Sequence, residues 1–325
     1  MRIATLETEN DVFVAPMAGV TDFAYRTILH GMGAGMLYTE MVSAKALYYG
    51  DRKTKSLMKT GEQVGTVGIQ IFGSEPAVMA YGAQCAEQMG CSLVDINMGC
   101  PVPKVTGNGD GSALMKSPVL AGKIVEAVKR AVSVPVTAKI RSGWDAQHIN
   151  APEMARILQE SGADAVTVHG RTKEQMYRGK ADWNVIAKVK QAVHIPIIGN
   201  GDVMRAQDAA SIIKQTGCDG VMLARGIMGN PWLVRQCVQQ LCGQQPEWPN
   251  QEEKIQMAMR HVALLVETKG ETIGILEARG HLSWYLKGMH GAAQAREQIN
   301  RAKQFNEIEE ILQKVLLEQS GQKGE

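Results

Sequence analysis

The sequence predicts a closed parallel (β/α)8 barrel, the TIM barrel, followed by an all-helical C-terminal domain. Over the first ~230 residues, short β-rich runs alternate with helical stretches, as they do in chains that build a parallel barrel. Eight such runs occur, which is the number of strands that the barrel needs. After a proline-containing break at residues 243–250, the remaining sequence has only helical periodicity.

The expected strands are separated by helical patterns in most cases, and only the stretch between the second and third strands is less regular. An open, doubly wound sheet is the alternative architecture, and periodicity alone does not exclude it. Both architectures place ligands at the carboxyl ends of parallel strands, so the choice does not alter the search for a site. The expected strands are residues 12–15, 36–39, 66–71, 93–97, 136–140, 165–169, 197–199 and 220–223, with the clearest helices at 76–89, 118–131, 152–161, 185–192 and 206–215.

The break at residues 243–250, "GQQPEWPN", has two prolines and no apolar period, so we expect a linker there. The expected domains are therefore residues 1–242 for the barrel and 251–325 for the helical domain. The last helix has an apolar face that should pack on a partner, and residues 320–325 should form a frayed tail. The helices are expected at 251–268, 273–287, 292–302 and 304–318.

Composition excludes several classes of protein. The chain has 325 residues, of which 45% are hydrophobic and 21% charged, as in globular proteins. Its net charge is only +2, so any affinity for nucleic acid has to come from a local patch. The sequence shows no long apolar run, no signal segment, and no cysteine or histidine spacing typical of zinc. We therefore expect a cytoplasmic protein with reduced thiols, no metal and no membrane segment.

Polar side chains lie at or just after the ends of five expected strands, where barrel enzymes carry their chemistry. Residues i and i+2 of a strand point the same way, so Lys139 and Arg141 share a face, as do Asp95 and Asn97. A single such group is often a satisfied core residue. Five repeats are hard to explain by packing, because burying amides and cations costs free energy unless a ligand supplies partners. The other members of the set are Gln70, Thr167, His169, Arg171, Asn200 and Asp202.

This set suits a polar, partly anionic cofactor, because it combines a firmly placed cation with several amides and few carboxylates. After the eighth strand, "ARGIMGNPW" (224–232) places Arg225 beside glycines, in a loop that commonly binds phosphate in barrels. FMN meets both requirements, since its ring takes amide contacts and a cation and its phosphate takes backbone N–H groups. The stretches "GMGAGM" (31–36) and "TGNGDGSA" (106–113) lack the full dinucleotide and P-loop patterns.

Cys100 follows the fourth strand in "DINMGCPVPK" (95–104), between a glycine and two prolines. It is either a reactive thiol at the mouth of a pocket or filler in a sharp loop. A lone cysteine is more often the latter, and the residues around it leave both interpretations open.

A series of short blocks runs along nearly the whole chain. In order they are "APMAGVTD" (15–22), "IQIFG" (69–73), "DINMGCPVPKV" (95–105), "KIRSGW" (139–144), "VHGRT" (168–172), "NGD" (200–202), "ARGIMGNPW" (224–232) and "ARGHLSWYLKG" (278–288). Together these blocks resemble the tRNA-dihydrouridine synthases, and more narrowly their bacterial B-type branch. The "MGCP" and "HGRT" blocks make the resemblance highly specific.

The resemblance implies an FMN-bearing barrel whose helical domain grips tRNA. Gln70 and Lys139 would lie against the flavin ring, and His169 near the ring and the phosphate tail. Ala224 stands where a glycine is common, which is harmless only if its φ is negative. The full cofactor site would comprise Pro16, Met17, Ala18, Gln70, Lys139, His169, Asn200, Gly201, Asp202, Ala224 and Arg225.

The reaction implied by the resemblance reduces the C5–C6 bond of specific uridines in the tRNA D-loop to 5,6-dihydrouridine. NADPH, or NADH, would reduce FMN, which would pass hydride to C6 while Cys100 gives a proton to C5. A thiol with a pKa near 8.5 stays protonated at neutral pH, so it is a competent acid. The uridine would have to be pulled from its stack to reach the flavin.

The helical domain carries a basic patch that could hold RNA. Residues 278–306 contain five lysines and arginines and one acid, whereas from residue 307 onward acids outnumber bases five to two. A solvated helix face is the plainer explanation of the same charges. By the resemblance and this patch, contacts with the substrate RNA are expected from Asn97, Lys104, Arg141, Arg171, Arg279, Lys287, Arg296 and Arg301.

Two other functions fit part of the sequence. An FMN-dependent oxidoreductase for a free dihydropyrimidine or dihydroorotate would share the barrel and the thiol, but it gives the basic helices no purpose. A catalytically inactive RNA-binding protein leaves unexplained why Lys139, Cys100 and the cofactor blocks are all intact. The partner expected for the chain is tRNA, and the chain is expected to act as a monomer.

Overall fold

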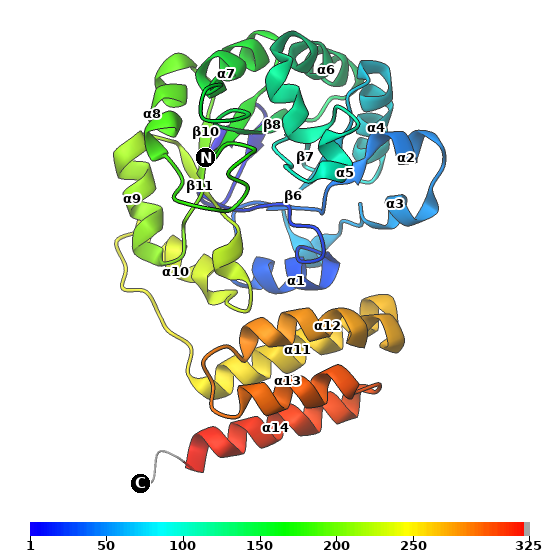
Figure 1. Ribbon diagram of the computed structural model, residues 1–325, viewed down its shortest axis with the longest axis vertical. Helices are drawn as coiled ribbons and strands as arrows, with labels where there is room; N and C mark the ends of the chain where they lie inside the picture. Colours follow the sequence, from blue (N-terminus) through cyan, green and yellow to red (C-terminus); the bar gives the residue numbers. More distant parts are fainter. Residues whose placement is uncertain (322–325) are drawn as a thin grey trace.

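The strands between Val12 and Leu223 form a parallel eight-stranded barrel, which confirms the predicted fold class (Figure 1). The structure is a computed structural model that describes residues 1–321. Neighbouring strands pair in parallel around the ring, and a parallel bridge between Phe13 and Met36 brings the first barrel strand to the second. The barrel strands are β3 (Val12–Val14), β4 (Leu37–Tyr38), β6 (Val67–Phe72), β7 (Leu93–Met98), β8 (Val136–Arg141), β9 (Ala165–His169), β10 (Ile197–Asn200) and β11 (Gly220–Leu223).

Helices surround the barrel, and the five whose positions were expected begin and end within two residues of those positions. The irregular stretch after the second strand contains a further short strand and two five-residue helices, too short to show a periodic pattern. The elements outside the barrel are β1 (Arg2–Ile3), β2 (Leu6–Glu7), β5 (Val42–Ser43), α1 (Phe23–Gly31), α2 (Ala44–Tyr48), α3 (Arg52–Ser56), α4 (Pro76–Gln88), α5 (Pro103–Thr106), α6 (Pro118–Ala131), α7 (Ala151–Glu160), α8 (Trp183–Ala192), α9 (Ala206–Thr216) and α10 (Trp232–Leu241).

The barrel interior is apolar near the amino ends of the strands and polar near their carboxyl ends. The residues of β8 alternate between the two sides of the barrel wall. Val136, Ala138 and Ile140 pack outward in the main core, while Lys139 and Arg141, near the carboxyl end of the strand, line a cavity. The N-terminal β1–β2 hairpin, which sequence patterns did not predict, adds Ile3 to the apolar plug. The buried members of that plug are Ile3, Phe13, Ala15, Met36, Tyr38, Leu93, Ala165, Ile198 and Met222.

Four helices follow residues 244–250, which have no helix or strand. Asn250 begins the first of them with a capping box, because its side chain accepts from the Glu253 N–H and the Glu253 carboxylate accepts from the Asn250 N–H. The last helix continues to Gly321 where a frayed tail was expected from residue 320, and residues 322–325 lie outside the described part of the chain. The four are α11 (Gln251–Lys269), α12 (Glu271–Tyr285), α13 (Ala292–Arg301) and α14 (Phe305–Gly321).

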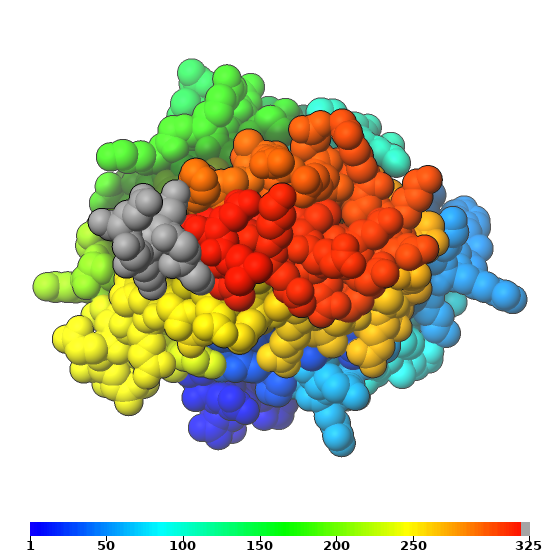
Figure 2. Space-filling view, turned by 90° about the horizontal axis from the view of Figure 1, so that it is seen from below, coloured from blue at the N-terminus to red at the C-terminus, as the bar shows by residue number. Residues whose placement is uncertain are grey.

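These helices pack under α1, with α11 in contact with it and α14 on the far side of the stack (Figure 1). Seen from below, α11–α14 cover most of that face of the molecule (Figure 2). Lys269 joins the two parts through ion pairs to Asp22, at the start of α1, and to Glu277 of α12. The ring of Tyr25 stacks on His261 with centroids 4.7 Å apart. The helical part is therefore fixed to the barrel by buried contacts.

Across residues 1–321, no helix is long and apolar enough to cross a membrane.

Gly229 sets the distance between a barrel loop and α12. Its φ is +67°, and a Cβ there would lie 2.4 Å from the Trp284 carbonyl carbon and 2.6 Å from the Tyr285 nitrogen. Gly243 has a similar φ of +73°, but nothing lies within 4 Å of its Cβ position. The two glycines share a backbone requirement and differ only in their surroundings.

We therefore expect Gly229→Ala to lower the midpoint of thermal unfolding much more than Gly243→Ala. Gly243→Ala should cost about 1 kcal/mol of backbone strain. Gly229→Ala should cost about 1–3 kcal/mol more, because α12 has to move away from the barrel. Circular dichroism melts of both variants measure the difference, and equal midpoints would contradict a close backbone contact at this position.

Candidate active site

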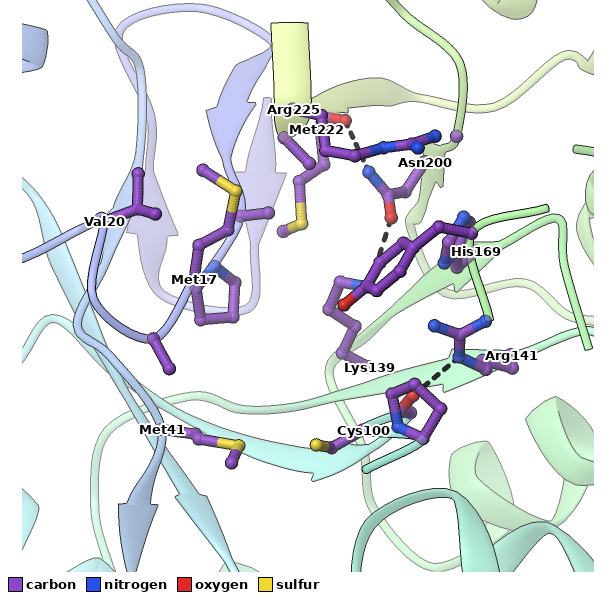
Figure 3. A pocket seen from close by; sticks show the side chains of 18 of the residues that line it. Met17, Val20, Met41, Cys100, Lys139, Arg141, His169, Asn200, Met222 and Arg225 are labelled. Atoms are coloured by element: carbon purple, nitrogen blue, oxygen red, sulfur yellow. Dashed lines mark hydrogen bonds between the residues drawn. The ribbon is translucent and has the colours of Figure 1, made fainter. Parts of the chain in front are cut away.

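A cavity of about 500 Å³ opens at the carboxyl ends of the barrel strands. Its volume is that of a small-molecule site, and its position is where barrel enzymes bind ligands. Most residues selected from the sequence meet here (Figure 3). Those that line it are Pro16, Met17, Ala18, Asn97, Cys100, Lys139, Arg141, His169, Asn200, Gly201, Asp202, Ala224 and Arg225.

Lys139 provides a half-buried cation in the wall of the cavity. Its Nζ donates a hydrogen bond to Asn200 Oδ1 at 3.2 Å, and Asn200 Nδ2 in turn donates to the Met222 carbonyl at 2.7 Å. Burial, followed by repulsion from Arg141, lowers the pKa of Lys139 to about 8. An ammonium group has three donors, so this cation retains capacity to bind a ligand.

Cys100 lies across the cavity from Asn200 and Arg225, beside Met41 (Figure 3). Asn97 Oδ1 accepts from the Cys100 N–H at 2.9 Å and from the Gly99 N–H at 3.2 Å. On the other side of the loop, the Ser112 hydroxyl donates to the Cys100 carbonyl at 2.9 Å. Burial raises the pKa of the thiol above its usual range, and the nearby charges of Arg141 and Lys139 oppose this only in part. The thiol is therefore protonated at neutral pH.

Arg141, at the end of β8, ties together the loops that follow β7 and β9. Its Nε donates to the Gly99 carbonyl at 2.7 Å, and its Nη1 donates to the carbonyls of Thr172 and Met176 at 2.8 and 2.9 Å. Burial lowers the pKa of Arg141 to about 10, so it keeps its charge. Arg141 therefore has both a structural role and a face in the cavity.

Tyr177, which sequence analysis missed, also lines the mouth. The guanidinium carbons of Arg141 and Arg225 lie 5.9 and 5.4 Å from its ring centroid. Its side chain is 52% exposed. The available signal was an aromatic residue in the loop that follows the polar end of β9.

Asp202 connects the loops after β9, β10 and β11 at the other rim. Both carboxylate oxygens of Asp202 accept from Arg171 Nη2, at 2.7 and 2.8 Å. Asp202 also accepts hydrogen bonds from Arg225 Nη2 at 3.2 Å and from the Ala181 N–H at 2.7 Å. Burial opposes ionisation of this carboxyl, but the Ala181 N–H and the arginine charges together lower its pKa. Ala224 has a φ of −137°, a negative value that does not call for glycine.

Two predicted contact residues do not line the cavity. Gln70 is fully buried behind Asn97 and bonds to Asp95 and Asn97, and its contact with the flavin ring stays a prediction. Arg171 is 2% exposed and donates to Asp202 and to the carbonyls of Arg178 and Gly179, so it does not reach a substrate base from there. Both are instead part of the framework behind the cavity walls.

The remaining predicted RNA contacts lie outside the cavity. Lys104 is exposed on α5, and Lys287 and Arg301 are exposed on the helical part. Arg296 is half-buried, and Arg279 is half-buried and donates to the Ala302 carbonyl at 3.1 Å. Arg279 thus holds α12 against the end of α13.

Comparison with known proteins identifies the family. The model of the dihydrouridine synthase (Dus) family matches residues 13–320. The chain belongs to the dihydrouridine synthase family. Family membership supports dihydrouridine synthase activity and agrees with the resemblance of the sequence blocks.

Curated relatives match over nearly their full lengths. A probable tRNA-dihydrouridine synthase 1 of Synechocystis is 41% identical over 97% of this chain and 89% of that protein. The tRNA-dihydrouridine synthase B of Pseudomonas aeruginosa is 39% identical over 93% of this chain and 91% of that protein. Among solved structures, the 6-hydroxypseudooxynicotine amine oxidase of Pseudomonas geniculata shares the fold at a TM-score of 0.59 and 13% identity, over 75% of this chain and 48% of that one.

The lowered pKa of Lys139 leads to a prediction about stability. The pKa in the folded state, about 8, lies below the ~10.4 of an unfolded lysine. The folded state therefore binds this proton more weakly, and the charge lowers stability at every pH below 8. The penalty fades as the pH rises from about 8 to ~10.4.

Lys139→Met should accordingly raise the thermal midpoint of the ligand-free protein at pH 7, by a free energy on the order of 2 kcal/mol. The gain should shrink by pH 10. Lys123→Met, on the exposed face of α6, serves as a control with no expected change. Melts at both pH values test this, and a gain that is independent of pH would show that desolvation of the charge is not its cause.

Proposed function

We propose that this protein is a tRNA-dihydrouridine synthase that reduces the C5–C6 bond of uridines in the tRNA D-loop, with FMN as bound cofactor and NADPH or NADH as reductant. Family membership supports the reaction. The observation that carries the proposal further is that the Cys100 thiol, whose pKa is raised by burial, and the half-buried cation Lys139 line one cavity. A proton donor and an electrostatic anchor for an electron-rich ring are thus present together.

The donor set of the cavity fits FMN. Lys139 and the amide of Asn200 would face the isoalloxazine ring, and the apolar wall of Pro16, Met17 and Ala18 would pack against it. Gly201 has a φ of +125°, and a Cβ there would lie 2.7 Å from Ala181 Cβ, so the cavity is lined by backbone at a position where a side chain would not fit. The phosphate end would be held by His169, Gly201, Asp202, Ala224 and Arg225, with Asp202 acting by fixing Arg225.

Cys100 would complete the reduction of the base. Bound FMN, once reduced by NADPH or NADH, would supply the hydride that C6 of the uracil accepts. The Cys100 thiol then gives its proton to C5, which neutralises the negative charge that builds up at C5 and O4. The charges of Arg141 and Lys139 stabilise the thiolate that remains. The half-buried sulfur recovers its proton from water at the cavity mouth.

Binding of the base requires that the uridine leave its stack. Asn97 and Arg141 line the cavity beside Cys100, so they are placed to contact the uracil edge or a neighbouring phosphate. Lys104, on α5 just beyond the thiol loop, is placed for the RNA backbone outside the cavity.

The helical part would hold the rest of the tRNA. In this proposal residues 1–242 are the catalytic domain, 243–250 the linker and 251–325 the tRNA-binding domain of a monomeric cytoplasmic enzyme. The exposed side chains of Lys287 and Arg301, with the half-buried Arg296 and Arg279, supply positive charge on that part. A substrate as large as tRNA gives these helices a purpose that a free pyrimidine does not.

Cys100→Ala tests the proposed chemistry. The purified wild type should absorb as a flavoprotein, and the variant should keep its flavin because the thiol is not needed to hold it. Dihydrouridine in tRNA from cells that lack the gene should be restored by the wild type, while the variant should form it at least 10²-fold more slowly.

Cys242→Ala is the matched control, because this thiol is exposed outside the cavity and should be dispensable. Full activity of Cys100→Ala would remove the thiol from the mechanism. Protein that stays colourless after addition of FMN would contradict the cofactor, and turnover of free dihydropyrimidine in place of tRNA would favour the small-molecule alternative.

Removing positive charge from the helices should weaken tRNA binding without slowing the chemistry. We expect Lys287→Ala combined with Arg296→Ala to raise the KM for tRNA about 10-fold, to leave kcat within ~2-fold and to reduce the salt dependence of binding by about one unit per lost phosphate contact. Lys314→Ala, on the exposed acid-rich face of α14, is the control. Equal effects of the double variant and of Lys314→Ala on the KM for tRNA would argue against a localised RNA surface.

A further inference from the structure

A chain of buried side chains runs from the barrel interior to the Cys100 loop. The Thr137 hydroxyl donates to Asp95 Oδ1 at 2.6 Å, and Gln70 Nε2 donates to Asp95 Oδ2 at 2.6 Å. Asn97 Nδ2 donates to Gln70 Oε1 at 2.7 Å. Asn97 Oδ1 then accepts from the N–H groups of Gly99 and Cys100. All four side chains are at most 7% exposed.

The chemistry of the two ends fixes the direction of this chain. An ionised carboxylate can only accept hydrogen bonds, so Gln70 has to turn its NH2 group toward Asp95 and its oxygen toward Asn97. Asn97 then has to turn its NH2 group toward Gln70 and its oxygen toward the loop. The backbone N–H groups of Gly99 and Cys100 can only donate, so they match that oxygen. Each amide therefore has one satisfied orientation.

The Asp95 carboxyl group is mainly ionised at neutral pH. Burial raises the pKa of Asp95 to about 6, while hydrogen bonds from Gln70 and Thr137 and the charge of Lys139 oppose the rise. At neutral pH the group is thus mainly an acceptor. It is also paired in β7 with Thr137 of β8 and with Gln70 of β6, so it links three adjacent strands.

We propose that Asp95 and Gln70 are positioning residues that hold the Cys100 thiol in place through Asn97. The inference rests on the proposed function in one respect, namely that Cys100 is the proton donor. It gives Gln70 a positioning role in addition to the flavin contact expected from the sequence. Asp95, Gln70 and Asn97 form a strut between the rigid strands and the loop, and only Asn97 reaches the cavity.

Two double variants separate positioning from simple stability. In Gln70→Glu with Asp95→Asn, the carboxylate moves to position 70, where it accepts from Asn97 Nδ2 and from the new amide at 95, so the strut keeps its direction. In Gln70→Met with Asp95→Leu, side chains of similar size replace the strut, and Asn97 Nδ2 loses its acceptor. The Thr137 hydroxyl loses its acceptor as well, while the hydrogen bond between Gln70 and Asp95 is removed together with both of its partners.

The informative measurement is the rate at which tRNA oxidises the reduced flavin, compared with the rate at which NADPH reduces it. We expect the Met/Leu variant to slow the tRNA step 10–10²-fold, because small displacements of a catalytic group have effects of this size. The Glu/Asn variant should stay within ~5-fold of the wild type and well above Gln70→Glu alone, in which two carboxylates adjoin. Reduction by NADPH does not involve the thiol, so with FMN in excess it should slow less than the tRNA step does in the Met/Leu variant.

Alkylation of Cys100 by iodoacetamide in flavin-free protein gives a readout that does not depend on activity. The Met/Leu variant should react several-fold faster than the wild type, because its loop is less firmly held, and the Glu/Asn variant should react as the wild type does. Equal behaviour of the two double variants in both assays would overturn the inference. If the Met/Leu variant does not fold, rescue of Gln70→Glu by Asp95→Asn decides, and a folded double variant that is not rescued also overturns it.

Failure of the proposed function is recognised separately. A wild-type protein that binds no flavin or forms no dihydrouridine would contradict the proposed function, whatever the variants do. The alkylation rates would still show whether Asp95 and Gln70 position the thiol.

Discussion

The burial of opposite charges inside the barrel is the constraint on which the rest of the site depends. Asp95 and Lys139 both point into the interior, where water is largely excluded, and each loses solvation free energy there. Each therefore needs fixed polar partners, which are Thr137 and Gln70 for the carboxylate and Asn200 for the ammonium. Because those partners lie on neighbouring strands, satisfying the charges also fixes the ends of the strands and the loops that follow them.

The cavity that results is electropositive. Lys139, Arg141 and Arg225 line it, and Arg171 lies directly behind it. Burial first, and then these four charges, lower the pKa of His169 well below the usual value, so the imidazole is neutral at pH 7. The carboxylate at the rim, Asp202, is already paired with two arginines. Such a cavity attracts phosphate and stabilises an electron-rich ring, and its cost to stability is recovered when an anionic ligand binds.

Much of this could be predicted from the sequence, because the period of two along a strand is a strong constraint. This period predicted that Asn97, Lys139 and Arg141 face the barrel interior, and in the structure all three line the cavity. The same rule does not give depth, and only the structure shows that Gln70 lies behind Asn97 and does not itself line the cavity. Arg171 follows its strand by two residues, and only the fold shows that Asp202 lies within reach of it.

Features without a periodic pattern were missed because the period of two along a strand was the main signal available. Tyr177 lies in a loop, where the position of its side chain depends on how Arg141, from another strand, binds the Thr172 and Met176 carbonyls of that loop. The β1–β2 hairpin has strands of two residues each, which are too short for alternation to be visible. Its contribution depends on the single buried residue Ile3, whose packing partners come from strands far along the chain.

That hairpin also has a kinetic consequence. With Ile3 and the apolar plug filling the amino end of the barrel, the described chain leaves the cavity its opening at the carboxyl end. In the proposed reaction, a nicotinamide and a nucleic acid would each reach the same flavin through this one entrance. Each would have to dissociate before the other could bind, so an excess of either would inhibit the other.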